Sequence, residues 1–233
     1  MVVVTGAGSG MGRSTATAFV KAGWLTVGID REQSGLDELA GQLGSAFRPY
    51  VADVTDLPQI TRVIDGCAAD AKLTAVANVA GIYPPTSLAT ATAERYRQIF
   101  DVNVLGTLNV ISASVPQLRT NGGGSIINFA SVDAFAVSPG QLLYSASKAA
   151  VVSLTRSLAV ELAGDHIVVN AIAPGWVDTP GNHATGRMSD VAATIPLGRV
   201  AAPEEIAEWV VHLARPGYLT GETIVLSGGS VIR

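Results

Sequence analysis

Tyr144 and Lys148, four positions apart, open a segment of the chain that the sequence predicts to be a helix. Because four residues make about one helical turn, both side chains leave the same face and can reach a common point. An ammonium ~4 Å from the phenol would contribute ~4 kcal/mol, enough to bring a tyrosine pKa of ~10 toward ~7. Such a tyrosine could act as a general acid or base. A surface tyrosine packed on a lysine stem has the same spacing.

A glycine-rich turn, Gly6–Gly12, stands between a predicted strand and a predicted helix. Its backbone N–H groups and the positive end of the helix could receive a pyrophosphate, although the spacing is not a clean G-x-G-x-x-G and also suits a tight turn. Asp30 follows Gly6 by 24 positions, near the offset at which an acid meets an adenosine ribose. A 2′-phosphate there would be repelled by roughly 4 kcal/mol, which favours NAD over NADP. The guanidinium of Arg31 keeps NADP open as the alternative.

Short β-branched runs and longer helical patterns alternate along the whole chain and must position these groups. The predicted strands are Val2–Thr5, Trp24–Ile29, Phe47–Val51, Leu73–Asn78, Ser125–Phe129, Ile167–Ala171 and Thr223–Leu226. The predicted helices are Met11–Ala22, Leu36–Leu43, a segment capped by Thr55, 91–118, Tyr144–Leu162 and Pro203–Leu213. This alternation predicts one α/β domain over 1–233, a doubly wound Rossmann fold with a seven-stranded, mostly parallel sheet and helices on both faces. The aperiodic stretch at about 176–198 is expected to be a substrate lid.

Composition excludes several classes of protein. With 48% hydrophobic and 15% charged residues, the 233-residue chain is not predominantly disordered. One cysteine, Cys67, and three scattered histidines argue against an intrachain disulfide or a metal site. A net charge of −4 without a basic run makes nucleic acid an improbable partner. We find neither a leader pattern nor ~18 uninterrupted apolar residues, so we expect a cytoplasmic location and no membrane partner.

Taken in order from Val2 to Gly229, the motifs resemble those of the short-chain dehydrogenase/reductase family. The resemblance implies four catalytic residues: Asn103, Ser131, Tyr144 and Lys148. It implies, together with the turn and Asp30, these cofactor-binding residues: Gly6, Ser9, Gly10, Met11, Gly12, Asp30, Arg31, Asp53, Val54, Asn78, Ala80, Gly81, Tyr144, Lys148, Pro174, Gly175, Val177 and Thr179. The candidate substrate-binding residues are Tyr83, Ser131, Asp133, Gln141, Trp176 and His183.

In the mechanism that the resemblance implies, Ser131 hydrogen-bonds the substrate oxygen and Tyr144 exchanges a proton with it while a hydride moves to or from the nicotinamide. Lys148 would lower the pKa of Tyr144 and hold the nicotinamide ribose, and Asn103 would order a water that links Lys148 to solvent. Two positions depart from the common pattern: Val79 replaces a second asparagine, and Ser227 replaces an aspartate. We expect the first to loosen local hydrogen bonding only slightly.

The sequence therefore predicts an oxidoreductase that transfers a hydride between NAD(H) and a secondary alcohol or ketone. An NADPH-dependent 3-oxoacyl-type ketoreductase is the main alternative on substrate, and a small polyol, sugar or cyclic diol is equally compatible. A non-catalytic nucleotide-binding scaffold is the alternative from another class. The helical patterns at 91–118 and 144–162 match the pair that forms a four-helix contact between subunits in the family, so we expect a homotetramer.

Overall fold

The computed structural model describes residues 1–184, 186 and 188–232. Its centre is a seven-stranded sheet in the order β3-β2-β1-β4-β5-β6-β7, and every neighbouring pair is parallel. The strands are β1 Val2–Thr5, β2 Thr26–Asp30, β3 Phe47–Val51, β4 Ala75–Asn78, β5 Gly124–Phe129, β6 Ile167–Pro174 and β7 Thr223–Leu226. The order reverses between β1 and β4, which is where doubly wound sheets bind ligands at their carboxyl edge. The predicted fold class is confirmed.

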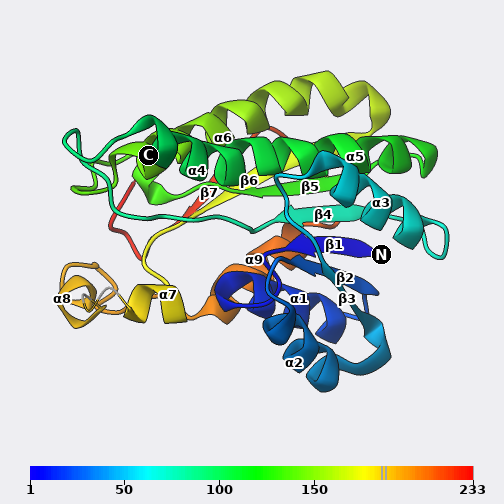
Figure 1. Ribbon diagram of the computed structural model, residues 1–233, viewed down its shortest axis with the longest axis horizontal. Helices are drawn as coiled ribbons and strands as arrows, with labels where there is room; N and C mark the ends of the chain where they lie inside the picture. Colours follow the sequence, from blue (N-terminus) through cyan, green and yellow to red (C-terminus); the bar gives the residue numbers. More distant parts are fainter. Residues whose placement is uncertain (185, 187, 233) are drawn as a thin grey trace.

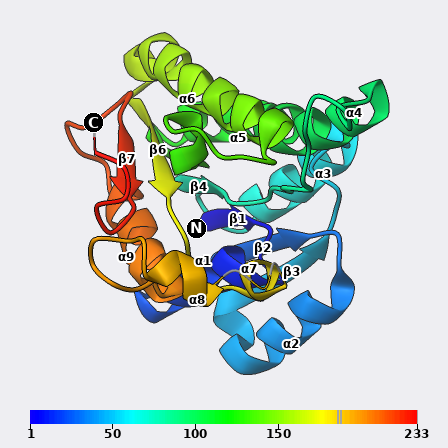
Figure 2. The same cartoon turned by 90° about the vertical axis from the view of Figure 1, so that its left-hand side faces the viewer.

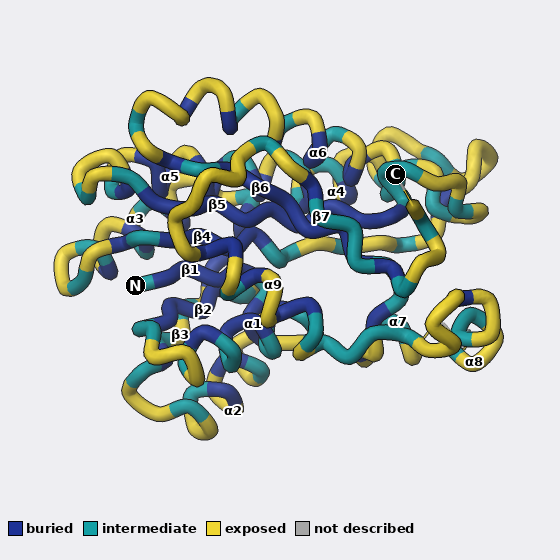
Figure 3. The backbone as a smooth tube through the Cα atoms, turned by 180° about the vertical axis from the view of Figure 1, so that it is seen from behind, coloured by how far each residue is buried: buried dark blue, intermediate teal, exposed yellow. Residues whose placement is uncertain are grey.

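Helices cover both faces of the sheet (Figure 1). One layer contains α3 (Leu57–Ala68), α4 (Ala93–Phe100), α5 (Thr107–Thr120) and α6 (Leu142–Leu162). The other contains α1 (Gly10–Lys21), α2 (Gln33–Leu43) and α9 (Pro203–Leu213), with α1 packed along α9. Figure 3 shows that burial is concentrated in the sheet and on the inner faces of these helices.

The strands form because their apolar side chains are buried on both faces. Val2, Val3 and Val4 of β1 are all fully buried. Successive side chains of a strand point to opposite faces, and accordingly Val3 joins the hydrophobic cluster under α3 and α5, while Val2 and Val4 join the cluster under α1 and α2. The two clusters together fix the plane and the register of the sheet.

The helix expected over 91–118 extends from Ala93 to Thr120 and is interrupted by a π-helical segment, η2, at Asp101–Gly106. Among the described residues, Ala93–Thr120 is long and apolar enough for a membrane span by length and composition alone, but 56% of its most apolar window is buried inside the protein. It packs against α3, α6 and the sheet, as the core helix of a globular fold does. The π-helical segment places Asn103 in the interior.

The N-cap of helix α3 is one residue later in the sequence than predicted. The N-cap is Asp56, whose Oδ1 accepts a hydrogen bond from Gln59 N at 2.9 Å. The hydroxyl of Thr55, the expected cap, instead donates to Asp53 Oδ1 at 2.8 Å. The expectation that Thr55 caps this helix was therefore wrong, because a carboxylate next to it is the better acceptor for the free N–H groups.

Two short helices, α7 (Pro180–His183) and α8 (Met188–Ala192), lie in the segment expected to be a lid. They follow β6 and lie beyond the carboxyl edge of the sheet, the edge that Figure 2 views. Three short 3₁₀ turns complete the fold: η1 Gly44–Ala46, η3 Val132–Ala134 and η4 Ala163–Asp165. The carboxyl ends of the strands and these two helices enclose the candidate site.

Candidate active site

The glycine-rich turn between β1 and α1 adopts a backbone that side chains would not allow. Gly6 and Gly10 have φ of +68° and +49°. A Cβ at Gly12 would lie 1.9 Å from the carbonyl oxygen of Gly6, so α1 can approach the turn only with a glycine there. The turn forms one wall of a cavity of about 340 Å³. The free N–H groups at the start of α1 suit an anion in that cavity.

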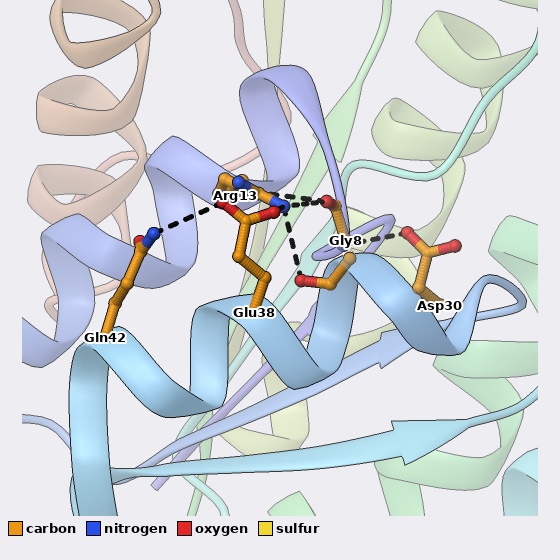
Figure 4. A network of polar contacts seen from close by, with 6 residues as sticks. Gly8, Arg13, Asp30, Glu38 and Gln42 are labelled. Carbon is orange, nitrogen blue, oxygen red and sulfur yellow. Dashed lines mark hydrogen bonds and ion pairs between the residues drawn. The ribbon is translucent and has the colours of Figure 1, made fainter.

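Side chains from α1 and α2 hold the turn from behind (Figure 4). Arg13 Nη2 donates to the carbonyl oxygen of Gly8 at 3.0 Å, to that of Gly35 at 3.3 Å and to Glu38 Oε2 at 3.0 Å. The hydrogen bond and the charge of Arg13 lower the pKa of the Glu38 carboxyl. On the other side, Gly8 N donates to Asp30 Oδ2 at 2.8 Å. The turn is thus fixed before any ligand binds.

The far end of this cavity is acidic. Its described lining includes three carboxylates, Asp30, Glu32 and Asp53, and one guanidinium, Arg31. The Arg31 side chain is 68% exposed, and its Nε lies 3.5 Å from Glu32 Oε1. In this structure the cation is therefore paired with a neighbouring acid at the same end of the cavity.

Twelve of the predicted cofactor residues line this cavity. They are Gly6, Ser9, Gly10, Met11, Gly12, Asp30, Arg31, Asp53, Val54, Ala80, Gly81 and Thr179. Tyr144, Pro174 and Gly175 line a second cavity, described below. Asn78, Lys148 and Val177 are buried and line neither cavity. The structure thus places most of the predicted cofactor residues around one cavity, three around the second cavity and three in the protein interior.

The turn after β4 is held by a residue that the sequence reasoning did not identify. Thr5 Oγ1 accepts hydrogen bonds from Val79 N and Ala80 N, each at 3.1 Å. Behind it, Asn78 Nδ2 donates to Asn128 Oδ1 at 2.9 Å. The backbone N–H of Val79 is therefore hydrogen-bonded, although Val79 lacks the side-chain amide of the asparagine that is common at this position in the family. A threonine at the end of a strand facing the turn is too common to have been singled out.

A second cavity, of about 580 Å³, contains Tyr144 and Ser131. These two side chains share a hydrogen bond. Met11, Tyr83 and Thr179 line both cavities, so the two adjoin one another. The phenol of Tyr144 therefore lies next to the end of a groove that begins at Asp30.

Burial raises the pKa of Tyr144 well above its usual range, and the hydrogen bond with Ser131 opposes this only in part. The expected lowering by Lys148 is not found. Lys148 Nζ donates to the carbonyl oxygen of Phe129 at 2.6 Å and lies 5.7 Å from the centre of the Tyr144 ring. Burial also lowers the pKa of Lys148 to about 8, so its ammonium is still mostly charged at neutral pH and loses its proton at mildly alkaline pH. Desolvation is therefore the main cause of the pKa shifts of both Tyr144 and Lys148.

Asn103 is fully buried, and its side-chain amide makes hydrogen bonds to residues far away in the sequence. Its Oδ1 accepts from Ile82 N at 2.8 Å, and its Nδ2 donates to Ile82 O at 2.9 Å and to Ser147 Oγ at 3.0 Å. The amide thus ties the turn after β4 to α6. A Cβ at Gly81 would lie 3.3 Å from Asn103 Oδ1 and 3.4 Å from Lys148 Nζ, so the two polar groups flank that glycine.

Five of the six predicted substrate residues line the second cavity: Tyr83, Ser131, Asp133, Gln141 and Trp176. The sixth, His183, does not. It lies on α7, where its imidazole pairs with Asp178, and both side chains are more than half exposed. His183 thus pairs with Asp178 in this structure, and its role in substrate binding stays a prediction.

Sequence reasoning missed lining residues from three segments. The lid contributes Asn182, Asp190, Val191, Thr194 and Ile195, the connection between η3 and α6 contributes Ala136, Val137, Ser138 and Pro139, and the C-terminal segment contributes Ser230 and Val231. Their positions carry no motif, and only the loss of periodicity at 176–198 indicated that the lid would matter. Within the described parts of the chain, no group of three His, Cys, Asp or Glu residues is arranged to hold a metal ion.

Comparison with known proteins agrees with this arrangement. A family model described as Enoyl-(Acyl carrier protein) reductase matches residues 6–230. The chain is 36% identical to a 3-oxoacyl-[acyl-carrier-protein] reductase of Thermotoga maritima, over 99% of this chain and 97% of the relative.

Two solved structures share the whole fold. A 3-ketoacyl-(acyl-carrier-protein) reductase from Brucella melitensis complexed with NADH is 31% identical, with a TM-score of 0.95 over 99% of this chain and 98% of that one. A protein from Beutenbergia cavernae with bound NADP, assigned as an NAD(P) dependent gluconate 5-dehydrogenase, is 34% identical, with a TM-score of 0.91 over 98% and 95%.

These relatives match over nearly the full length of the chain, and the family's motifs line two adjoining cavities at the carboxyl edge of the sheet. The nucleotide that such enzymes bind is a nicotinamide dinucleotide, as the two solved structures contain. The chain belongs to the short-chain dehydrogenase/reductase family and is an oxidoreductase that acts on secondary alcohols or ketones.

Proposed function

We propose that this chain is an NAD(H)-dependent dehydrogenase/reductase of secondary alcohols and ketones, with Tyr144 as its general acid and base. One observation carries the proposal. The hydrogen-bonded pair Tyr144 and Ser131 lies in a cavity that adjoins, through Met11, Tyr83 and Thr179, the glycine-walled groove leading to Asp30. A nicotinamide dinucleotide supplies the hydride acceptor or donor when bound. During oxidation, an alcohol in the second cavity would give up a hydride from its carbon and a proton from its oxygen, the latter to Tyr144.

The groove fits such a cofactor on the evidence of its own residues. Positive φ at Gly6 and Gly10, and a position at Gly12 that no side chain can occupy, leave backbone N–H groups free to receive phosphate oxygens. Asp30, at the far end, would accept hydrogen bonds from a ribose. We assign Asp53 and Val54 to the adenine end and Gly175, Val177 and the rest of the segment after β6 to the nicotinamide end.

Each of the four predicted catalytic residues would then have its own role in the reaction. Ser131 would hold the substrate oxygen by a hydrogen bond, and Tyr144 would give it a proton during reduction or take one during oxidation. Lys148 would hold the nicotinamide ribose and bring its charge near the phenol. Asn103 would act as a positioning residue, since its amide fixes the turn after β4 against α6.

The charges at the end of the groove support NAD over NADP. Three carboxylates and one paired guanidinium line that end, so a 2′-phosphate would meet net negative charge. At an effective dielectric of ~20, each unpaired unit charge ~4 Å away would cost about 4 kcal/mol. NADPH preference would require Arg31 to leave Glu32 and Asp30 to turn away.

We also propose that 176–198 is a lid and that the protein is a homotetramer. Helices α5 and α6 are long, and the same layer carries exposed apolar side chains, with Leu105 in η2 44% exposed and Val160 of α6 82% exposed. Burying that layer against a second subunit would remove them from water. Sedimentation equilibrium at micromolar concentration should give about four times the 23.9 kDa chain mass.

The direct test is a fluorescence titration of the purified chain with NADH and with NADPH at one ionic strength, followed by a screen of alcohols with the preferred cofactor. Tight NADH and weak NADPH binding, with turnover of a secondary alcohol, is the expected result. Preference for NADPH with turnover of a 3-oxoacyl thioester would favour the ketoreductase alternative. Cofactor binding without any turnover would favour the scaffold.

A further inference from the structure

The substrate cavity contains a carboxylate that the proposed proton transfer does not use. Asp133 lies on η3, two residues after Ser131, and its N–H donates to Ser131 Oγ at 3.1 Å. Asp133 Oδ1 accepts a hydrogen bond from the Ser138 hydroxyl. The described residues give Oδ2 no hydrogen-bond partner. A charged acceptor therefore stands beside the residue that would hold the reacting oxygen.

Asp133 is also close enough to the acid/base residue to affect it. Its charge raises the pKa of Tyr144, and burial raises the pKa of the Asp133 carboxyl itself. The described residues that line the cavity include no Lys, Arg or His. A partly desolvated carboxylate without a cation is stabilised by ligand groups that donate hydrogen bonds.

A second acceptor in the same wall is also unused. Gln141 precedes α6 and lines the cavity, and its Oε1 is a buried atom to which no described residue donates a hydrogen bond. A buried acceptor left without a donor is unfavourable, so a small rotation of this side chain toward a ligand hydroxyl would be favoured. Asp133 and Gln141 together make the wall rich in acceptors.

These features favour some substrate classes over others. An anionic substrate would face two carboxylates, Asp133 and Asp190 from α8, and the described lining contains no Lys, Arg or His. A simple acyl thioester has no hydroxyl to donate to Asp133 or Gln141. An uncharged molecule with more than one hydroxyl satisfies both acceptors and still presents one oxygen to Ser131 and Tyr144.

We propose that the substrate is an uncharged polyhydroxy compound, such as a vicinal diol, a polyol or a cyclic sugar, and that Asp133 recognises the hydroxyl next to the reacting carbon, with Gln141 as a second acceptor. The inference rests on the proposed function, because it places the reacting oxygen at Ser131 and Tyr144. Asp133 is thereby a specificity-determining residue.

The test compares substrates that differ by one hydroxyl. The full chain is assayed with saturating NAD⁺ and three alcohols, namely cyclohexanol and the cis and trans isomers of 1,2-cyclohexanediol. The value of kcat/KM is measured for each alcohol. A hydrogen bond to a charged group corresponds to a preference of about 10- to 100-fold, so we expect one diol isomer to exceed cyclohexanol by that factor. Equal values, or a preference for cyclohexanol, would overturn the inference while leaving the oxidoreductase function intact.

Variants test whether Asp133 is the residue that causes the preference for a diol over cyclohexanol. Asp133→Asn keeps the shape and removes the charge, and should reduce the diol-to-cyclohexanol ratio of kcat/KM by about tenfold or more. Gln141→Met tests the second acceptor and should reduce the ratio by a smaller factor. Asp70→Asn makes the same chemical change at an exposed ion pair with Arg48 and should leave the ratio unchanged. Thermal unfolding shows that each variant is folded, and an unaltered ratio in folded Asp133→Asn would contradict the assignment.

A binding measurement separates failure of the inference from failure of the function. Calorimetric titration of the NADH-bound chain with the diols and with cyclohexanol does not require turnover. Diol binding that Asp133→Asn weakens would support the inference even if no alcohol were oxidised. Binding of neither compound, together with no turnover, would overturn the inference and the proposed function at once.

Discussion

The backbone N–H of Gly8 donates a 2.8 Å hydrogen bond to Asp30 Oδ2, so the acid that ends β2 is fixed against the glycine-rich turn. A Cβ at Gly8 would lie 3.0 Å from the same oxygen. The turn that would receive phosphates and the carboxylate that would receive a ribose are therefore parts of one rigid unit, held from behind by Arg13.

Replacing Asp30 with alanine should reverse the order of cofactor preference or abolish it. The change removes a charge-assisted hydrogen bond to the ribose, typically ~1.5–3 kcal/mol, and also the repulsion of a 2′-phosphate. We expect NADH affinity to fall by about tenfold or more and NADPH affinity to stay equal or rise, both measured by fluorescence titration. An unchanged ratio of the two dissociation constants would contradict the role of Asp30.

Replacing Gly12 with alanine should disrupt the turn, because the added Cβ would lie 1.9 Å from the carbonyl oxygen of Gly6. Overpacking of this kind costs ~1–3 kcal/mol, so the free energy of unfolding should fall by that amount and NADH binding should be lost. Gly41→Ala is the matched control in α2, since nothing lies within 4 Å of its added Cβ. It should stabilise the protein by ~0.5–1 kcal/mol. If Gly12→Ala and Gly41→Ala changed the free energy of unfolding equally in urea titrations, the packing argument would be refuted.

Alcohol oxidation should become faster as pH rises, because Tyr144 accepts a proton only in its ionised form and burial raises its pKa. The negative charge of Asp133 adds to that increase, so Asp133→Asn should shift the pH profile of kcat/KM to lower pH. The hydrogen bond from Ser131 opposes the increase, so the residual activity of Ser131→Ala should shift to higher pH. Shifts of about one pH unit or less are expected. Two shifts in the same direction would be inconsistent with these assignments.

Much of the fold was predictable because strand burial and helix periodicity are local properties of the sequence. Val2 to Val4 and the glycines after them specify a buried strand and a turn without reference to the rest of the chain. The parallel sheet with helices on both faces followed from the alternation of strands and helices, whereas the order of the strands was not predicted. The cap of α3 was misassigned by one residue because Thr55 and Asp56 are both good caps, and only the backbone geometry decides between them.

The candidate site was less predictable, because its electrostatics depend on packing between distant segments. The pKa of Tyr144 was expected to fall from its spacing to Lys148, but spacing does not reveal that the ammonium bonds to Phe129 in β5. His183 was placed in the cavity from its position in the lid, whereas its orientation follows from the nearby Asp178. Thr5 emerged only from the geometry of the turn after β4.

The most direct test of the account is the activity of Tyr144→Phe, which removes one hydroxyl from the substrate cavity. With the preferred cofactor and an alcohol that the wild type oxidises, kcat should fall by at least about 100-fold, since general acid–base catalysis contributes that much or more. The dissociation constant for NADH and the thermal stability should stay close to the wild-type values. Turnover at the wild-type rate in a folded, NADH-binding Tyr144→Phe variant would contradict the central claim.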